Sequence, residues 1–259
     1  MGKTAVVTGG SSGIGKACCI LLSQNGYTVY ELSRSGKDAP GIRHITADVT
    51  RKEQVDAAVE QILAETGVID ALVLSAGMGI AGSVEESPAE QVEKQFSVNF
   101  MGVLFPIQAA LPSMREKKAG SIVVISSVAA VVPIPYQSMY SATKAALNAL
   151  VLSLRSEVKE DGIRVCGVMP GDTRTGFTDA RITVPDSKYP HAAHAIAVME
   201  KDERSGMPPE RIAAKVRKVL NSRSPRPLCT VGFSYHMILF LMRVLPQRWS
   251  SYLVGRIYR

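Results

Sequence analysis

Tyr140 and Lys144, four positions apart in the segment YSATK, are the residues whose types and spacing most clearly suggest chemistry. On a helix, residues i and i+4 lie one above the other on the same face. A free tyrosine has a pKa of about 10, and a nearby ammonium favours the phenolate and lowers that pKa. Because acid–base catalysis is most effective when the pKa is near the operating pH, the pair is a candidate proton donor and acceptor.

Ser127 and Asn99 add two polar groups at positions where the apolar pattern is interrupted. Ser127 follows the predicted strand SIVVIS and lies thirteen residues before Tyr140, and Asn99 interrupts an apolar helical stretch within SVNFMG. A Tyr–Lys pair alone is common on solvated helix faces. The additional residues therefore favour a reactive group over an ordinary exposed helix.

A glycine-rich turn, TGGSSGIG at residues 8–15, follows the first predicted strand and opens the first predicted helix. Gly9 lets the chain leave the strand sharply, while Gly13 and Gly15 leave room for a pyrophosphate at the helix N-terminus, whose free N–H groups attract anions. The spacing is GxxxGxG rather than GxGxxG, and a plain tight turn is the alternative. The candidate cofactor-binding residues of the turn are Gly9, Ser11, Ser12, Gly13, Ile14 and Gly15.

The end of the second predicted strand, ELSRS at residues 31–35, bears on the choice of dinucleotide. Ser33 and Arg34 suit a 2′-phosphate, because a guanidinium pairs with phosphate in a forked geometry. Glu31 points to the same face as Ser33 by strand alternation and could accept hydrogen bonds from the adenosine ribose, which is typical of NAD sites. The pattern favours NADP(H), and NAD(H) is the alternative. For Arg34 itself, the alternative is an ordinary solvated surface arginine.

Strands and helices alternate along the chain and must position these residues. Strands are predicted at 3–8, 27–32, 42–46, 70–74, 121–126 and 163–169, and helices at 13–25, 52–65, 136–160 and 208–220. The strands are apolar throughout, which is typical of a parallel sheet covered on both faces. We therefore predict an α/β fold with a doubly wound, mostly parallel sheet of the Rossmann type in three α/β/α layers. In such folds ligands bind at the carboxyl ends of the strands.

Taken together, these segments resemble the short-chain dehydrogenase/reductase family. The resemblance spans about residues 3–176, and several independent motifs occur in the family's order and spacing. The matching segments are TGGSSGIG at 8–15, Asp48-Val49, Ala76-Gly77, Asn99, Ser127 with Tyr140 and Lys144, and Pro170-Gly171 followed by Thr175. The segments EESP, LPSM and SSVAAVVPIP, with the C-terminal tail, resemble the hydroxysteroid- and lipid-type branch, an assignment by analogy.

The resemblance implies a role for each matching residue. Tyr140 would exchange a proton with the carbonyl or alcohol oxygen, and Ser127 would hold and orient that oxygen. Lys144 would bind the nicotinamide ribose and lower the tyrosine pKa, and Asn99 would fix a water that relays protons to solvent. Hydride passes directly between nicotinamide and carbon, so no metal is expected. The remaining cofactor contacts implied are Asp48 and Val49 at the adenine, Ala76 and Gly77, and Pro170, Gly171, Thr173 and Thr175 beside the nicotinamide.

Two regions fit the family pattern less closely. Ser75 stands where the family usually has Asn before the Ala-Gly pair, which bears on local rigidity more than on catalysis. Residues 172–207 fall where the family carries its substrate lid. His191 and His194 lie there, and we expect ordinary polar roles for both.

The C-terminal segment 233–259 is basic and apolar, within a domain predicted to include residues 1–259. Residues 211–259 contain ten Lys or Arg and no Asp or Glu, and the apolar run MILFLM is too short to span a bilayer. Arginines with interfacial aromatics fit a helix at a membrane surface. They equally fit a helix that packs over the pocket or in an oligomer interface, which we favour because Met and Leu stripes are usually core. Either alternative indicates a hydrophobic, steroid-like or lipid-like substrate.

The composition also bears on the cellular location and on functions other than catalysis. The N-terminal sequence MGKTAVVTGG has no basic and apolar leader pattern, and the four cysteines at 18, 19, 166 and 229 form no metal or disulfide pattern. We expect a cytoplasmic homo-oligomer, with peripheral membrane contact through the tail as an alternative. A non-enzymatic dinucleotide sensor or scaffold on the same fold is a second hypothesis. Nucleic-acid binding is not expected, because the basic tail interleaves bulky aliphatic residues and contains no recognisable motif.

Overall fold

A seven-stranded parallel sheet forms the centre of the computed structural model, which describes residues 2–184 and 187–258. The strand order is β3-β2-β1-β4-β6-β7-β9. Because the order reverses between β1 and β4, a crevice is expected at the carboxyl ends of those two strands. The predicted doubly wound Rossmann-type fold is confirmed. The strands are β1 (Lys3–Thr8), β2 (Tyr27–Ser33), β3 (Ile42–Thr46), β4 (Ala71–Leu74), β6 (Gly120–Ile125), β7 (Ile163–Met169) and β9 (Leu228–Thr230).

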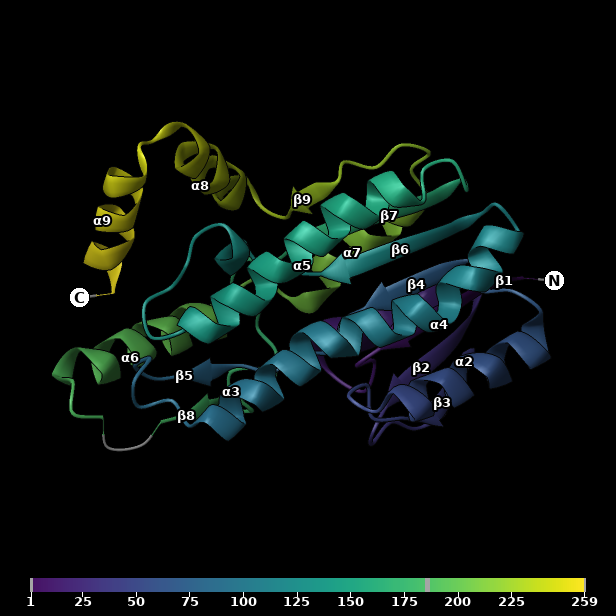
Figure 1. Cartoon of the computed structure of the whole chain (residues 1–259), viewed down its shortest axis with the longest axis horizontal. Coiled ribbons are helices and arrows are strands. Elements are labelled where there is room, and N and C mark those ends of the chain that lie inside the picture. The colour runs from purple at the N-terminus through teal and green to yellow at the C-terminus, as the bar shows by residue number, and fades with distance from the viewer. Residues whose placement is uncertain (1, 185–186, 259) are drawn as a thin grey trace.

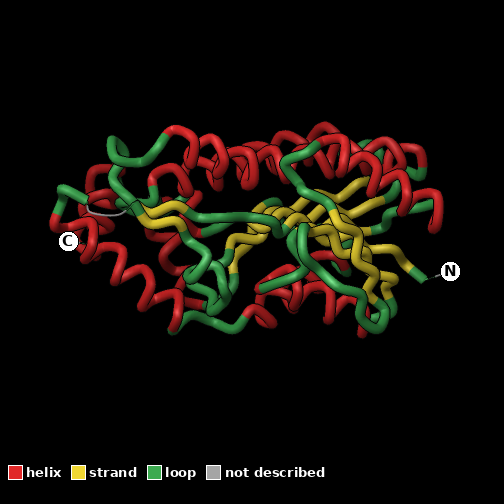
Figure 2. The backbone as a smooth tube through the Cα atoms, turned by 90° about the horizontal axis from the view of Figure 1, so that it is seen from below, coloured by secondary structure: helices red, strands yellow, loops and turns green. Residues whose placement is uncertain are grey.

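Helices cover both faces of this sheet, and Figure 2 shows the two helical layers above and below the strands. The helices are α1 (Gly13–Gln24), α2 (Lys52–Thr66), α3 (Ala89–Phe96), α4 (Gly102–Glu116), α5 (Ser138–Glu157), α6 (Pro190–Arg204), α7 (Pro209–Leu220), α8 (Phe233–Val244) and α9 (Gln247–Ile257). A π-helical turn at Ser97–Met101 joins α3 to α4. Figure 1 shows α8 and α9 as an elbow at the end of the molecule that lies farthest from the N-terminus.

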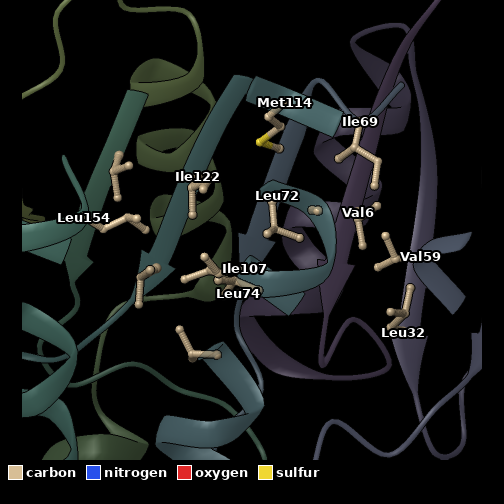
Figure 3. Packing of buried hydrophobic residues seen from close by; sticks show 14 of the residues in the cluster. Val6, Leu32, Val59, Ile69, Leu72, Leu74, Ile107, Met114, Ile122 and Leu154 are labelled. Carbon is tan, nitrogen blue, oxygen red and sulfur yellow. The ribbon is translucent and has the colours of Figure 1, made fainter. Parts of the chain in front are cut away.

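The alternation of side chains along β1 explains why the core has two halves. Val6 faces a cluster built with α2, α4 and α5, whereas Ala5 and Val7 face a second cluster built with α1 and α7. Figure 3 shows the first cluster, in which Leu72 and Ile122 of adjacent strands meet side chains of α4. Apolar residues on both faces of a strand are what a sheet buried on both sides requires.

The continuous helical run Ala89–Glu116 is long and apolar enough to cross a membrane by length and composition alone. In the fold, its C-terminal half packs on the sheet instead. Val103, Ile107 and Met114 of α4 are all buried in the first core cluster. The apolar character of α4 is therefore used by the core.

A second, smaller sheet places the predicted lid over the carboxyl edge. β5 (Ile80–Ala81), which follows β4, pairs in parallel with β8 (Ile182–Thr183), and Ile80 is opposite Ile182. Figure 1 shows this pair beside α3 and α6. Neither short strand was predicted, nor was β9, because two or three residues carry no detectable periodicity.

Candidate active site

The glycine turn between β1 and α1 fits tightly against the end of β4, so its glycines are required sterically. Gly9 has a φ of +67°, and an added Cβ would lie 2.8 Å from the Cα of Ala76. An added Cβ on Gly15 would lie 2.2 Å from the carbonyl oxygen of Gly9. Thr8 links the same two strand ends, because its Oγ1 accepts hydrogen bonds from the backbone N–H groups of Ser75 (3.2 Å) and Ala76 (3.4 Å). Side chains are excluded here, which leaves backbone exposed to a ligand.

The N-terminus of α1 is available to an anion. Ser12 is the N-cap residue, and its side chain makes no capping hydrogen bond among the described residues. Thr175 lies over the first turn, where its Cβ would be 3.2 Å from a Cβ added to Gly13, so the turn and the segment after β7 form two sides of one crevice. Free N–H groups and the helix dipole at such a position attract phosphate.

At the end of β2, Glu31 lies in a different environment from Ser33 and Arg34, the residues predicted to contact a 2′-phosphate. The Glu31 side chain is buried beneath the turn, and its Oε2 lies 2.5 Å from Nδ1 of His44 on β3. Arg34 is exposed, and Ser33 Oγ is buried without a hydrogen-bond partner among the described residues. Glu31 Oε1 also lacks one. The Glu31 carboxylate is thus buried, whereas Ser33 is half-buried and Arg34 is exposed.

Asp48 and Val49 follow β3 and complete this end of the crevice. Burial alone would raise the pKa of Asp48, but hydrogen bonds from the backbone and hydroxyl of Thr50, helped by the charge of Arg34, hold it below its usual value. Val49 is buried and packs against Gly102, where an added Cβ would lie 2.7 Å from Val49 Cγ2. Asp48 therefore stays ionised beside Arg34.

Tyr140 and Lys144 lie on the same face of α5, as predicted. Lys144 Nζ is 5.6 Å from the centroid of the Tyr140 ring, and it donates a hydrogen bond of 3.0 Å to the carbonyl oxygen of Ile125 at the end of β6. Lys144 is only 5% exposed, whereas Tyr140 is half-buried. One hydrogen bond leaves two ammonium donors of Lys144 for other partners.

The pKa values of this pair differ from the sequence-based expectation. Burial raises the pKa of Tyr140 to about 12, and the hydrogen bond from Ser127 is the strongest effect in the opposite direction. Burial also lowers the pKa of Lys144 to about 8. Removal from water disfavours the charged form of both groups. The predicted lowering of the tyrosine pKa is thus wrong for the protein without a ligand, where desolvation dominates.

Ser127 lies beside Tyr140, and Asn99 lies near Lys144. Ser127 caps the short 3₁₀ turn Val128–Ala130 by accepting the N–H of Ala129 at 3.1 Å, and its hydroxyl reaches Tyr140. Asn99 is fully buried, and its amide bonds both backbone groups of Met78 and, through Nδ2, the hydroxyl of Thr143 at 3.0 Å.

Asn99 lies close to Gly77 and to the ammonium group of Lys144. A Cβ added to Gly77 would lie 3.5 Å from Asn99 Oδ1 and 3.7 Å from Lys144 Nζ. Asn99 thus fixes the loop after β4 beside the ammonium, and it does so from the π-helical turn. Such turns often occur at functional sites.

The segment after β7 closes the crevice from the other side. Pro170 accepts the N–H of Val128 at 2.9 Å, which ties it to the Ser127 turn, and the hydroxyl of Thr173 donates to Gly171 at 2.9 Å. Tyr235 of α8 lies flat against Gly171, because a Cβ added there would fall 2.0 Å from its ring. Its hydroxyl donates to Asp172 Oδ2 at 2.6 Å and accepts the Asp172 N–H at 2.8 Å.

Three residues near the reactive pair were missed by the sequence analysis. Tyr235 is one. Phe177 packs against Tyr140, with ring centroids 5.6 Å apart, and Arg181 stacks on Phe177 while its side chain pairs with Glu203 of α6. All come from distant segments that the lid and α8 bring over the crevice. Only an aromatic residue in an otherwise polar loop, FTD at 177–179, could have signalled one of them.

A cavity of about 520 Å³ opens at the start of α5, where Ser138 of its lining lies two positions before Tyr140 in the chain. It is bounded by the segment before α5, the loop after β5, the start of α6 and the end of α9. Its lining includes Tyr136, Ser138, Tyr189, His191 and Tyr258. A smaller depression of about 220 Å³ lies at the opposite edge, at Lys3 and Tyr27. The larger one lies at the end of the molecule where α6 and α9 meet the start of α5.

The residues present fit a dinucleotide along this crevice. The glycine turn offers bare backbone and a helix N-terminus, Ser33 Oγ is an orphaned polar atom at the far end, and Lys144 has free donors at the near end. The crevice connects these points along one edge of the sheet. Adjacent to Tyr140, such an arrangement supports hydride exchange beside a proton donor.

Comparisons with known proteins agree with this geometry. The family described as "short chain dehydrogenase" matches residues 3–184. The chain is 40% identical to a 3-ketodihydrosphingosine reductase of Bacteroides thetaiotaomicron over 233 residues, which is 88% of this chain and 87% of that protein. A short-chain dehydrogenase structure from Streptomyces avermitilis has a TM-score of 0.84 at 30% identity, covering 92% of this chain and 91% of that one. A Burkholderia phymatum structure in complex with NAD has the same fold, with a TM-score of 0.82 at 24% identity and 94% and 92% coverage.

Proposed function

The chain belongs to the short-chain dehydrogenase family and is an oxidoreductase acting on CH–OH groups with NAD(P); from that premise we propose that it uses NADP(H) to reduce the ketone of a hydrophobic, lipid-like substrate. The observation that carries the proposal is the placement of Tyr140 above the buried Lys144 at the edge of the glycine-lined crevice. When bound, the dinucleotide supplies or accepts the hydride.

Tyr140 is the proton donor in this reduction. With a pKa raised to about 12, its hydroxyl remains protonated at neutral pH and can transfer its proton to an oxygen that gains negative charge. Ser127, whose hydroxyl already reaches Tyr140, holds the carbonyl oxygen at the same place. The raised pKa favours reduction over oxidation, because oxidation requires the tyrosine to give up its proton first.

Lys144 supplies positive charge and positions the dinucleotide. Its two remaining ammonium donors face the crevice and bind the ribose hydroxyls, and its charge stabilises the phenolate that forms after proton transfer. A pKa lowered to about 8 also lets Lys144 return a proton to Tyr140 near neutrality. Asn99 holds the Met78 loop beside Lys144 and would fix the water that relays protons between Lys144 and solvent.

The preference for NADP(H) is supported by the end of β2. Arg34 is exposed and can pair with a 2′-phosphate, and Ser33 Oγ is without a partner among the described residues. Glu31, the candidate ribose acceptor, pairs with His44 instead and lies beneath the turn. The Oε2 atom of Glu31 is thus engaged inside the protein, and Arg34 is the exposed cationic side chain at the end of β2.

The lipid-like substrate is supported by the related reductase and by the cavity. The Bacteroides relative is named for a long-chain ketone, and the 87% of that protein that is matched includes the region of the lid. The cavity at the start of α5, the helix that carries Tyr140, is lined in part by Tyr258 from the apolar C-terminal segment. A steroid-like ketone is the second substrate class to be tested.

The test is a panel of ketones assayed by nicotinamide absorbance with NADPH and with NADH. We expect turnover of long-chain 3-keto lipids with NADPH, and a loss of about 10³-fold in kcat for Tyr140→Phe with dinucleotide affinity unchanged. Tyr27→Phe is the matched control, since Tyr27 lies at the opposite edge, in the smaller depression. Turnover that survives in Tyr140→Phe would exclude the proton-donor role, and turnover restricted to small polar ketones would exclude the lipid substrate.

A further inference from the structure

The exposed large hydrophobic side chains of the described residues are concentrated in α8 and α9. Ten of the sixteen belong to these two helices, of 12 and 11 residues. Phe233 is 81% exposed and Phe240 60% exposed, and in the described chain α8 contributes no buried residue. The favoured sequence-based interpretation is packing over the pocket or in an oligomer interface. Within the chain, Tyr235 and Tyr258 pack in this way, whereas the apolar side of α8 does not.

The exposed residues of each helix form a stripe. In α8 five of the six lie at i, i+4, i+7, i+8 and i+11, and the sixth, Ile238, lies at i+5 beside them. In α9 all four lie at i, i+3, i+4 and i+8, and each of these spacings describes one face of a helix. Single exposed apolar residues are normal, whereas aligned stripes mark interaction surfaces. The stripes are Phe233, Met237, Phe240, Leu241 and Val244 in α8, and Trp249, Tyr252, Leu253 and Ile257 in α9.

The charge of this surface selects its partner. The exposed residues Arg243, Arg248 and Arg256 lie on the two helices, and residues 211–259 contain no Asp or Glu. A two-fold contact between two copies of this surface would bring arginines together without an acidic residue from the same segment to pair with them. Anionic lipid headgroups supply the missing negative charge, at about 1 kcal/mol for each arginine near the surface.

We propose that α8 and α9 form a docking surface for an anionic lipid bilayer and lie in its interfacial plane. At 1.5 Å per residue, neither helix approaches the roughly 30 Å of a hydrocarbon core, so neither spans it. Trp249, which has the Arg248 guanidinium 5.6 Å from its ring centroid, and Tyr252 have the amphipathic character of residues at membrane interfaces.

The docking surface adjoins the substrate cavity, and this part of the inference rests on the proposed lipid substrate. Gly255 and Tyr258, at the end of α9, line the cavity, while Tyr235, in the first turn of α8, lies against Gly171. A bilayer bound by the two helices would therefore lie at the cavity mouth. A lipid ketone could enter the cavity from the bilayer without crossing water.

The test is binding of the full chain to vesicles of equimolar phosphatidylcholine and phosphatidylglycerol, and to vesicles of phosphatidylcholine alone, measured by flotation. We expect binding to the anionic vesicles and at least tenfold weaker binding to the neutral ones. Combining Arg243→Gln, Arg248→Gln and Arg256→Gln should weaken binding to anionic vesicles about 100-fold. Combining Phe240→Ser and Trp249→Ser should weaken it at least about tenfold.

A matched control carries equivalent changes on another surface. Ile20→Ser on α1, where Ile20 is 43% exposed, combined with Lys117→Gln after α4, should leave vesicle binding unchanged. All variants should turn over a short, soluble ketone at the rate of the unmodified protein, which shows that they fold. Equal binding by the arginine variant, or binding to both vesicle types alike, would overturn the electrostatic docking.

Two further outcomes separate this inference from the proposed function. The unmodified protein could fail to bind either type of vesicle, while sedimentation shows that Phe240→Ser with Trp249→Ser dissociates an oligomer. In that case the surface joins copies of the chain and the docking proposal fails. If vesicles bind as expected but no long-chain ketone is reduced in any form, docking is supported and the proposed substrate fails instead.

Discussion

At the carboxyl edge of the sheet, polar groups are buried, whereas in α8 and α9 apolar groups are exposed. Lys144 and Asn99 are almost without solvent contact, yet each has a specific partner: the carbonyl of Ile125 for one and the Met78 loop for the other. Phe233 and Phe240 stand in solvent on the C-terminal elbow. Both arrangements are costly in isolation, since buried charge loses hydration and exposed apolar surface orders water.

The difference between the two regions indicates where each cost is offset. At the reactive edge the partners are within the chain, so the geometry is fixed before any ligand binds, which is what proton transfer requires. On the elbow the apolar stripes lack partners within the described chain, so the favourable contact has to come from outside. The first region thus suits the proton transfer that we propose, and the second suits the docking that we propose.

The largest expected effect that sharpens this comparison concerns Lys144. Because burial lowers its pKa to about 8, Lys144 is charged below that pH and neutral above it. Ketone reduction should therefore fall as the pH rises through about 8, and Lys144→Ala should lose roughly 100-fold or more at all pH values. Steady-state rates between neutral and alkaline pH, at saturating dinucleotide, measure both effects.

Lys144→Arg provides the control for that prediction, because a guanidinium does not titrate in this range. The variant should keep part of the activity and lack the alkaline decline. A decline that persists unchanged in Lys144→Arg would assign it to another group.

A smaller effect is expected at the outer end of the crevice. Arg34→Ala should raise the KM for NADPH by roughly 10- to 100-fold, the equivalent of one charge-assisted hydrogen-bonded pair, and leave the KM for NADH unchanged. Lys37→Ala is a matched control on the same exposed loop. Equal effects of Arg34→Ala on both dinucleotides would show that the residue reads no 2′-phosphate.

The smallest effect tests whether the two regions are coupled. Tyr235 joins α8 to the segment after β7 through two hydrogen bonds with Asp172. Tyr235→Phe keeps the ring on Gly171 and leaves the half-buried Asp172 carboxylate without this donor, which should destabilise the fold by about 1 kcal/mol. Chemical unfolding measures the loss, and the pH profile of kcat should stay unchanged, because the residue positions the loop and does not exchange protons.

Thr178→Val is the comparison for that variant, since Thr178 donates to Glu203 within the lid and does not reach α8. If Tyr235→Phe also weakens vesicle binding and Thr178→Val does not, the elbow is held in place through Tyr235. Unchanged stability in Tyr235→Phe would show that α8 is attached by its ring contact alone.

The sequence predicted the regular parts of the fold closely. The strands at 3–8, 42–46 and 163–169 have the bounds expected from their apolar runs, and the helix carrying Tyr140 begins at Ser138 rather than at 136. Periodicity is a local property, so it survives in a single sequence. The strands of two or three residues, β5, β8 and β9, could not be recognised because their pairing depends on distant segments.

The structure brings Tyr140 and Lys144 together as the sequence predicted, but the direction of the tyrosine pKa shift was missed. The helical spacing of Tyr140 and Lys144 and the turn at 8–15 follow from residue order, which also indicated a dinucleotide crevice. The pKa values did not follow, because they depend on how much water the folded chain removes from each group. Phe177 and Tyr235 were missed for the same reason, since the lid and α8 bring them to the site from far along the chain.

By itself, the sequence determined which residues can react and on which elements they lie, because spacing along a strand or helix fixes the direction of side chains. Only the tertiary structure decided which charges are desolvated, that Glu31 pairs with His44, and that the C-terminal stripes are exposed. These properties depend on contacts between distant segments and on the water they exclude. Neither is encoded in local spacing.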